Sequence, residues 1–336
     1  MMKTRVLKAS LASTRECVQL LQKGYPVALP TETVYGLAAN GLDESALRKI
    51  FEVKGRPLID PLILHFKSLT HVKEHAQDNH LLSKLGKLFW PGPLTLIVAK
   101  KTSIPDLATA GMKSVAVRVP SNTVFRSILE TIDFPLAAPS ANPFGYISPT
   151  TAEHVLSTLG NRIHLILDDG PTNYGVESTI LDIRNPLKPT ILRHGPILIE
   201  DLERCLGVTI LDPKTDGDNQ FENQVAPGQL KQHYSPHTAL SLLPYGTWKR
   251  GINLKLSAGP EKIALVYTRK PKVICDQTYW LSEVGNMDEI ARNLFSTLHK
   301  LDAMKLDKVY IELPSKNGFG AAINDRLQRA AAKSMQ

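Results

Sequence analysis

The densest group of polar side chains is the run Pro30–Leu37 (PTETVYGL), which directly follows an apolar strand pattern at Pro26–Leu29. The hydroxyls of Thr31 and Thr33 could bind a small polar ligand, and Gly36 permits close approach of a backbone or ligand. Ligand sites in α/β folds favour the carboxyl ends of strands. The run is therefore a candidate binding site, and the alternative is a polar turn that caps a helix.

Two basic motifs could neutralise an anionic ligand. Lys54-Gly55-Arg56-Pro57 stands at the end of a predicted helix, and Arg118 ends the strand pattern Ser114–Arg118. Arg binds phosphate or carboxylate as a two-pronged donor, and Lys binds as a point charge. Two structural explanations stay open. Cations complement the dipole at a helix C-terminus, and Arg118 could form an internal salt bridge.

Polar side chains also lie at the ends of several other predicted strands. They are His65, Ser114, Ser140, Asn142, Ser148, Glu177, Ser178 and Arg193. Taken alone, His65 is more simply a structural histidine with satisfied hydrogen bonds. Taken together, a hydroxyl, amide or cation at the end of strand after strand predicts a lined polar pocket.

Short apolar runs that alternate with amphipathic stretches predict the elements that position these side chains. We expect strands at Pro26–Leu29, Leu62–Phe66, Leu94–Ala99, Val115–Val119, Leu136–Ala138, Leu165–Leu167, Thr179–Ile183 and Thr190–Leu192. We expect helices at Thr14–Gln22, Glu44–Val53, Leu81–Phe89, Val124–Ile132 and Ala152–Leu159. This alternation predicts an α/β domain, and strands that follow one another directly predict a mixed sheet.

A break in the pattern divides the chain of 336 residues, a length that itself favours two domains. Turn-forming residues replace the apolar periodicity around 212–223, so 209–238 is predicted to be a linker between domains 1–208 and 239–336. The second domain is expected to be a smaller α/β unit. Its predicted strands are Ala239–Leu243, Ile263–Tyr267 and Val309–Leu313, and its predicted helices are Met287–Met304 and Ala321–Ala332.

The net charge of +8 is unevenly distributed along the chain. Residues 1–150 hold 18 basic and 11 acidic residues, residues 151–238 hold 7 and 12, and residues 239–336 hold 15 and 9. Two basic blocks suit a nucleotide, a nucleic acid or a membrane surface without choosing among them. The N-terminus lacks the apolar core of a signal peptide, no apolar run is of bilayer length, and three scattered cysteines form no metal or disulfide pattern. We therefore expect a soluble cytoplasmic protein.

Several familiar motifs are absent from the sequence. There is no G-x-x-x-x-G-K-[ST] loop, no G-x-G-x-x-G after a strand, no H-E-x-x-H, no C-x-x-C and no G-x-S-x-G. A nucleotide site would therefore be built from scattered cations and hydroxyls at strand ends.

In their combination and order, these motifs resemble the YrdC-type L-threonylcarbamoyladenylate synthases. The motifs are Pro30–Leu37, Lys54–Pro57, Ser114–Arg118, Ser140–Asn142 and Glu177–Thr179. Pro227-Gly228, His233–Pro236 and Gly318–Leu327 resemble the longer, two-domain form of the family. The resemblance implies an N-terminal twisted mixed sheet with flanking helices around a basic pocket, and a smaller C-terminal Rossmann-like α/β domain.

The resemblance also implies a reaction. L-threonine, bicarbonate or CO2, and ATP with Mg2+ would give threonylcarbamoyl-AMP and pyrophosphate. A separate tRNA threonylcarbamoyl transferase would then modify the adenosine next to the anticodon, so direct tRNA binding by this chain is not required.

Carried over residue by residue, the resemblance assigns roles to individual positions. The threonine-binding residues would be Thr33, His65, Arg118, the Ala138 backbone and Ser178. The ATP-binding residues would be Lys54, Arg56, Asp60, Ser114, Ser140, Asn142, Ser148, Arg193 and Tyr234. No covalent nucleophile is implied. Tyr234 would reach over the nucleotide and make the linker a lid, with His233 as the neighbouring alternative.

Asp60 departs from the family pattern K-x-R-P-x-x-N-P, because this chain carries Asp where the family has Asn. An ionised Asp cannot donate the amide hydrogen bond of Asn, and it would repel a phosphate unless Mg2+ intervenes. We retain Asp60 as a site residue and leave its contact with phosphate or metal open.

Two functions of other kinds compete with the synthase. A basic concave surface also suits an RNA-binding module, although aromatic residues make up only 6% of the chain. A carbamoyl-adenylate enzyme of hydrogenase maturation uses a related domain, but it also needs a cysteine-rich zinc module that three scattered cysteines cannot supply.

Overall fold

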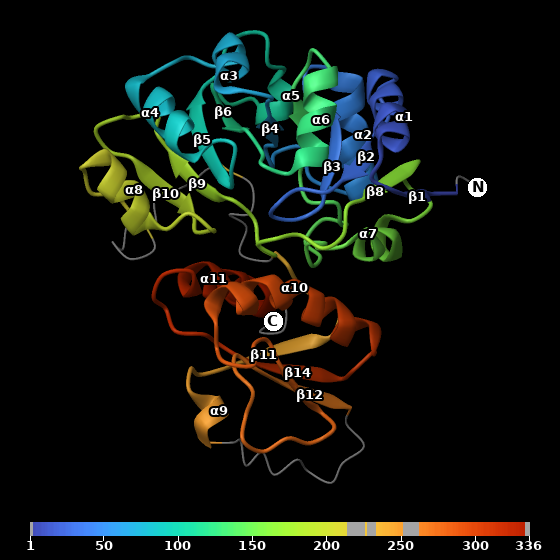
Figure 1. The fold of residues 1–336 in the computed structure, drawn as a ribbon, viewed down its shortest axis with the longest axis vertical. Helices are drawn as coiled ribbons and strands as arrows, with labels where there is room; N and C mark the ends of the chain where they lie inside the picture. Colours follow the sequence, from blue (N-terminus) through green and yellow to red (C-terminus); the bar gives the residue numbers. More distant parts are fainter. Residues whose placement is uncertain (1–2, 214–225, 227–232, 251–261, 333–336) are drawn as a thin grey trace. The chain divides into compact units, whose positions relative to one another are not determined.

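The computed structural model describes residues 3–213, 226, 233–250 and 262–332 (Figure 1). Contacts divide the chain into two compact units. Unit 1 comprises Met1–Phe144, Pro149–Asn173 and Glu177–Gln229, and unit 2 comprises Gly145–Ser148, Tyr174–Val176 and Leu230–Gln336. The predicted domain boundaries at 208 and 239 stay a prediction. Most of the predicted linker, including Pro227 and Gly228, lies outside the described residues.

Unit 1 is built on a ten-stranded sheet. Its strands are β1 (Arg5–Lys8), β2 (Val27–Leu29), β3 (Gly36–Asn40), β4 (Ile63–His65), β5 (Leu94–Ala99), β6 (Ser114–Arg118), β7 (Leu136–Ala137), β8 (Leu165–Asp168), β9 (Thr179–Asp182) and β10 (Thr190–Arg193). The order across the sheet is β1-β8-β2-β3-β7-β4-β6-β5-β9-β10. Four neighbouring pairs are parallel, namely β1/β8, β2/β8, β4/β6 and β5/β9, and the other five are antiparallel. The prediction of a mixed sheet is confirmed.

Most helices of unit 1 follow a residue whose side chain caps the first turn. The helices are α1 (Leu11–Gln22), α2 (Glu44–Lys54), α3 (Leu69–His75), α4 (His80–Phe89), α5 (Asp106–Thr109), α6 (Thr123–Thr131), α7 (Ala152–Leu159) and α8 (Ile199–Leu206). The exceptions, which lack such a cap, are α5 and α8. The side chains of Asp43 and Thr151, for example, accept hydrogen bonds from the first-turn amides of α2 and α7. Helix α2 ends at Gly55, whose φ of 63° lies in the left-handed region. Glycine adopts this region at little cost, and the chain turns there between Lys54 and Arg56.

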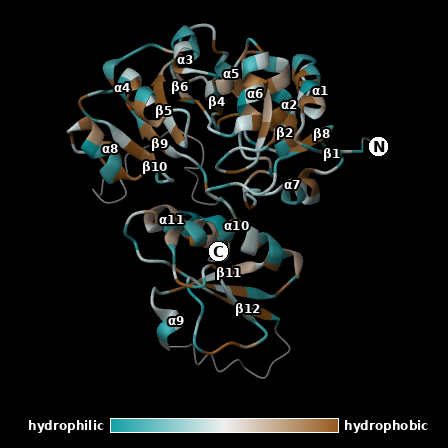
Figure 2. Ribbon diagram, in the orientation of Figure 1, coloured by the Kyte–Doolittle hydropathy of each residue, from teal (hydrophilic) through white to brown (hydrophobic). Residues whose placement is uncertain are grey.

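Helices cover the two faces of this sheet unequally. On one face, the core includes apolar residues of α2, α4 and α7, such as Ile50, Leu82 and Val155. On the other face, α1 and α6 pack over the half of the sheet that contains β2, β7 and β8. The half that contains β4, β5, β6, β9 and β10 carries a smaller apolar cluster with no helical residue among those described. No described helix covers that half of the face, which we call the open face. Figure 2 shows the hydrophobic strands and the more hydrophilic outer helices.

Unit 2 has a parallel sheet of its own. The elements are β11 (Ala239–Leu243), α9 (Thr247–Arg250), β12 (Ile263–Tyr267), β13 (Thr278–Trp280), α10 (Met287–Ala303), β14 (Lys308–Glu312) and α11 (Gly320–Ala331). The strand order is β11-β14-β12-β13, and every pairing is parallel. The helices α10 and α11 pack together, and α11 packs on β11 (Figure 1). The expected Rossmann-like α/β arrangement is confirmed.

Among the described residues, no helix combines the length and the apolar character that a membrane span requires.

Candidate active site

Two of the polar motifs lie side by side because their backbones pair. The run Pro30–Leu37 links β2 to β3, and the Leu37 amide donates to the Pro139 carbonyl at 2.7 Å. The Ala141 amide donates to the Tyr35 carbonyl at 2.8 Å. A Cβ at Gly36 would come within 3.2 Å of the Ala138 Cβ, so glycine permits this close approach. The backbone pairing therefore brings Thr33 and Ala138 to one edge of the open face.

A buried ion pair forms the first cluster of the site, which we call the Arg118 cluster: Glu32, Thr33, His65 and Arg118. Nη2 of Arg118 lies 2.7 Å from Oε1 of Glu32, and both side chains are only 4% exposed. Nη1 of Arg118 donates to Oγ1 of Thr33 at 3.2 Å. His65 lies beside Arg118 because β4 and β6 pair in parallel register. The internal salt bridge that the sequence left open is therefore present, and its anionic partner is Glu32.

The electrostatics of the Arg118 cluster are close to balanced. Burial and the charge of Arg118 lower the pKa of His65 to about 3, so its imidazole is neutral near pH 7. Burial alone would raise the pKa of Glu32, but the guanidinium of Arg118 outweighs this effect and the net pKa is lowered. The cluster therefore holds one cation, one carboxylate and a neutral ring.

A second cluster, the Asp60 cluster, contains Lys54, Arg56, Asp60 and Arg193. Nη2 of Arg56 lies 2.9 Å from Oδ1 of Asp60, and both side chains are almost fully buried. Nζ of Lys54 donates to the carbonyl oxygens of Ser140 and Asn142 at 2.6 and 2.5 Å. These two hydrogen bonds hold the Ser140–Asn142 segment next to the C-terminal end of α2.

Cations outnumber carboxylates in the Asp60 cluster. Burial and the charge of Arg56 hold the pKa of Lys54 well below its ordinary value. Burial also raises the pKa of Asp60, although three nearby cations oppose that shift: Arg56, Lys54 and Arg193. A buried excess of positive charge is costly, and an anionic ligand would relieve it.

Arg193, a member of the Asp60 cluster, also contacts Ser178, which is a predicted threonine-binding residue. Its Nε donates to the Ser178 carbonyl at 3.0 Å, and its Nη2 donates to Oγ of Ser178 at 3.0 Å. The Ser178 hydroxyl also bonds Oγ1 of Thr95 at 2.8 Å. Because the charge of Arg193 also acts on Asp60, this side chain interacts with one residue predicted to bind threonine and one predicted to bind ATP.

A patch of apolar side chains on the sheet forms the floor of the proposed site. Side chains alternate along a strand, so Ser114, Ala116 and Arg118 share one face of β6. Ala116 belongs to the small cluster with Ile63, Ile97, Ile180 and Leu192. Ala226, which comes from the predicted linker, is fully buried in the same cluster. One linker residue therefore packs on the open face of unit 1.

Several buried polar atoms around this floor have no hydrogen-bond partner within the described part of the chain. They are Oδ2 of Asp60, Oε2 of Glu32, Nδ1 of His65 and Oγ of Ser114. Buried polar groups are normally paired, so such a concentration on one face calls for a ligand.

Two predicted site residues belong to the other unit. Ser148 is in unit 2, where its carbonyl lies 3.2 Å from Nε2 of His299. Tyr234 is also in unit 2, and its ring packs 5.6 Å from that of Phe295 and beneath the guanidinium of Arg326. Their assignment to ATP stays a prediction.

The sequence interpretation missed Glu32 and Thr95. Glu32 lies beside Thr33 within the run Pro30–Leu37. A buried Arg118 needs an anionic partner, and this need could have identified Glu32 from the sequence. Thr95 lies in an apolar strand, and only the pairing of β5 with β9 brings it to Ser178.

Comparisons with known proteins cover nearly the whole chain. Residues 19–195 match the Sua5_yciO_yrdC family model, described as "Telomere recombination", and residues 197–332 match "Threonylcarbamoyl-AMP synthase, C-terminal domain". The threonylcarbamoyl-AMP synthase of Pyrococcus abyssi is 37% identical over 93% of this chain and 92% of its own length. That of Bacillus subtilis is 35% identical over 94% and 92%.

A solved structure has the same fold. Pyrococcus abyssi Sua5 complexed with L-threonine matches with a TM-score of 0.88 and 33% identity, over 99% of this chain and 98% of that one. The resemblance inferred from the motifs is confirmed. The chain belongs to the Sua5/YrdC family, in the two-domain form that its curated threonylcarbamoyl-AMP synthase relatives share.

Proposed function

We propose that this protein makes L-threonylcarbamoyl-AMP and pyrophosphate from L-threonine, bicarbonate or CO2, and ATP. Curated relatives that match over more than nine-tenths of the chain carry the name of this synthase. The observation that carries the proposal is the pair of buried clusters in unit 1, one balanced in charge and one rich in cations.

The Arg118 cluster suits an amino acid. L-threonine is a zwitterion, so it needs one cation for its carboxylate and an acceptor for its ammonium or amine. Arg118 supplies the cation, and Glu32 has an oxygen without a hydrogen-bond partner in the described structure. Thr33, His65, Ser178 and the Ala138 backbone complete the proposed threonine-binding set.

The Asp60 cluster suits a triphosphate. Lys54, Arg56 and Arg193 offer more positive charge than Asp60 neutralises. We assign the phosphates to these cations, and we assign further ATP contacts to Ser114, Ser140, Asn142, Ser148 and Tyr234.

The chemistry requires positioning more than a nucleophilic side chain. The amine of threonine adds to CO2 and releases a proton to water to form a carbamate, and a carbamate oxygen attacks the α-phosphorus of ATP. The bond from the α-phosphorus to the bridging oxygen breaks, and that oxygen leaves as part of pyrophosphate. Arg193, which touches Ser178 and acts on Asp60, is placed to neutralise charge where the two substrates meet.

We expect ATP to arrive as its Mg2+ complex. Oxygen ligands from one or two carboxylates plus substrate phosphates are the usual set for Mg2+. Oδ1 of Asp60 is already paired with Nη2 of Arg56, so we assign Mg2+ to the substrate phosphates rather than to Asp60. Bound Mg2+ would offset charge on the phosphates, while Arg56 holds Asp60 in place.

The linker is the proposed lid over the substrates. Ala226 is buried against Ile63 and Ala116 on the open face, so one point of the linker reaches the site region. We propose that linker closure excludes water from the carbamate and the adenylate, both of which hydrolyse readily.

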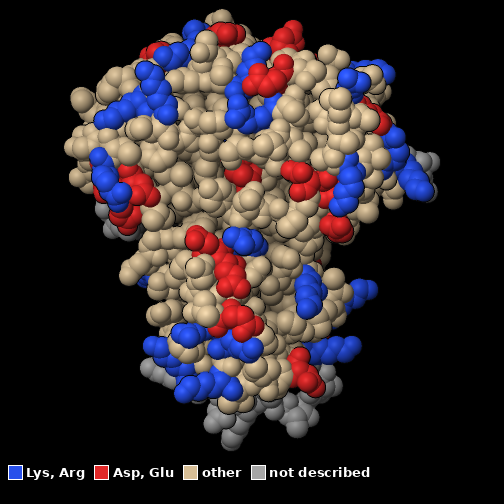
Figure 3. All heavy atoms as spheres, in the orientation of Figure 1, with Lys and Arg blue, Asp and Glu red and all other residues tan. Residues whose placement is uncertain are grey.

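The product would pass to a separate tRNA threonylcarbamoyl transferase. On the face drawn in Figure 3, basic side chains stand in small groups among acidic ones. Direct tRNA binding is not needed to explain the basic charge, because Lys54, Arg56, Arg118 and Arg193 are buried in the proposed site.

Pyrophosphate release from ATP, with and without L-threonine and bicarbonate, tests the proposal. We expect release only when all three substrates are present. Release that does not depend on threonine, or tight RNA binding without turnover, would refute it.

A further inference from the structure

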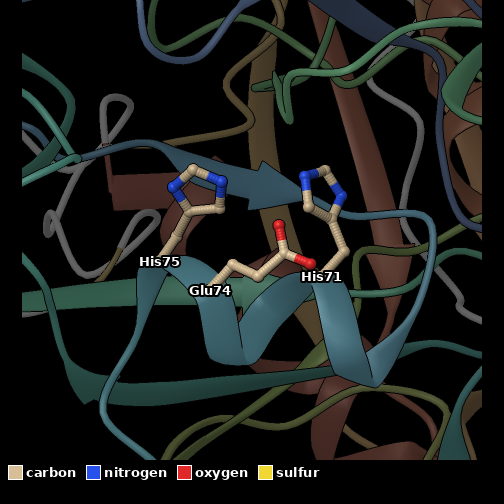
Figure 4. Close-up of side chains that lie close together, drawn as sticks. All are labelled: His71, Glu74 and His75. Carbon is tan, nitrogen blue, oxygen red and sulfur yellow. The ribbon is translucent and has the colours of Figure 1, made fainter.

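Three potential metal ligands gather on the short helix α3, which follows β4. They are His71, Glu74 and His75, and one ligand atom of each lies within 4.8 Å of the other two. Residues spaced i, i+3 and i+4 share one face of a helix. Figure 4 shows one nitrogen of each imidazole turned toward the other ring, with the Glu74 carboxylate between them.

Backbone contacts hold this helix at both ends. The side chain of Ser68 caps it by accepting a hydrogen bond from the His71 amide at 3.1 Å. At the other end, the His75 carbonyl accepts from the Lys101 amide at 2.9 Å, and the Gln77 amide donates to the Ala99 carbonyl at 2.9 Å. The ligand atoms therefore project from a fixed support, which favours binding over an equivalent cluster on a loop.

His71 packs into the apolar core beside the cluster. His71 is 3% exposed, its ring meets Phe66 edge-on, and its Nδ1 has no hydrogen-bond partner in the described structure. This packing fixes the orientation of the His71 ring.

The outer nitrogen of His75 already has the partner that metal ligands usually have. Its Nδ1 lies 3.0 Å from Oγ of Ser103. Metal-ligating histidines commonly donate their second ring N–H to an oxygen, which fixes the tautomer and the orientation of the ring. This contact leaves the other nitrogen of His75 facing Glu74 and His71.

We propose that His71, Glu74 and His75 bind a divalent transition-metal ion of the Zn2+ type, with a fourth position open to water or a further ligand. Two imidazoles and one carboxylate suit Zn2+, Ni2+ or Cu2+ better than Mg2+, which prefers oxygen ligands. Tetrahedral Zn2+ places its ligand atoms roughly 3.4 Å apart. In the structure the ligand atoms lie within 4.8 Å of one another. Rotation of the exposed Glu74 side chain and the half-buried His75 side chain would bring them to the shorter Zn2+ spacing.

The site is distinct from the proposed synthase chemistry, because none of its ligands belongs to the Arg118 or Asp60 cluster. A bound ion would cross-link one turn of α3 and stabilise this part of unit 1.

Zn2+ titration of the EDTA-treated full chain tests the proposal by calorimetry, with Co2+ absorption as a report on coordination geometry. We expect one Zn2+ per chain, and excess Mg2+ should not displace it. Glu74→Gln should weaken Zn2+ binding about tenfold and His75→Gln about 100-fold. The matched controls are His80→Gln, at an exposed histidine of the next helix, and Cys275→Ser, at an exposed thiol. Neither should change the affinity.

Two results would overturn the proposal. One is the absence of Zn2+ binding by the parent protein, and the other is equal binding by the parent, Glu74→Gln and His75→Gln proteins. These variants alter side chains that are not fully buried, so a melting curve without metal verifies that each still folds.

Discussion

The Arg118 and Asp60 clusters both belong to unit 1, yet they differ in charge balance. In the Arg118 cluster, one guanidinium faces one carboxylate, and the nearby histidine is neutral. In the Asp60 cluster, three cations act on a single carboxylate. The difference matches two kinds of ligand, because a zwitterionic amino acid brings almost no net charge and a triphosphate brings several negative charges.

The largest expected effect comes from removing the Arg118–Glu32 pair as a unit. Arg118→Met alone would leave a buried carboxylate unpaired, at a cost of about 3–5 kcal/mol in stability. The double change Arg118→Met/Glu32→Gln avoids that cost. It should raise the KM for threonine about 100-fold, because it removes a two-pronged charged contact.

Pyrophosphate-release kinetics at varied threonine and varied ATP measure this effect. The KM for ATP should stay within about threefold of the parent value, since the change is electrically neutral. Equal effects on both substrates would mean that Arg118 does not hold the threonine carboxylate.

The corresponding double change in the Asp60 cluster, which also leaves the net charge unchanged, is Arg56→Met/Asp60→Asn. It should raise the KM for ATP roughly 10- to 30-fold and leave the KM for threonine nearly unchanged. The same kinetic series reports the result. A larger effect on threonine than on ATP would reverse our assignment of the two clusters.

The two clusters should also differ in their response to pH. The pKa of Lys54 is lowered in the free protein, and a bound triphosphate would raise it. Between the two pKa values the ATP complex holds more protons than the free protein, so ATP affinity should fall by up to about tenfold per pH unit as pH rises. Threonine affinity should not follow this trend, because the Arg118 cluster is balanced.

Calorimetry in two buffers of different ionisation enthalpy measures this proton uptake, at a pH where ATP itself is fully ionised. Uptake of about one proton or less with ATP, and close to none with threonine, is the expected result. Proton release on ATP binding would contradict the proposed contact with Lys54.

The smallest effect is expected from Asp60→Asn. Removing one carboxylate increases the positive excess, so ATP affinity should be retained or improved by a few-fold. Isothermal titration with a non-hydrolysable ATP analogue and Mg2+ checks it, with a melting curve as the control for folding. A large loss of ATP affinity would indicate that the carboxylate has a role of its own, on the metal.

Much of unit 1 was predictable because apolar runs mark buried strands. β5, from Leu94 to Ala99, agrees to the residue, and β6 differs by only one residue at each end. β3 was missed, because Gly36 and Leu37 were interpreted as part of the polar loop. β1, with three of its four residues exposed, carries no apolar pattern, and β13 is short and only half buried.

The site was predictable as a set of residues but not as a set of contacts. Strand ends and hydroxyls indicated Thr33, Arg118 and Ser178, whereas the ion pair of Glu32 with Arg118 joins positions 86 residues apart. Asp60 was expected to repel phosphate, but its pairing with Arg56 gives it a structural reason to be present. The metal-ligand motif H-x-x-E-H at His71–His75 was visible in the sequence and was not recognised.

Crossed equilibrium binding tests the central claim most directly. L-threonine and a non-hydrolysable ATP analogue are titrated separately into the parent protein, the Arg118→Met/Glu32→Gln protein and the Arg56→Met/Asp60→Asn protein. The account predicts that the first variant loses threonine binding and keeps nucleotide binding, and that the second does the reverse. Loss of both ligands in both folded variants, or the opposite pairing, would contradict it.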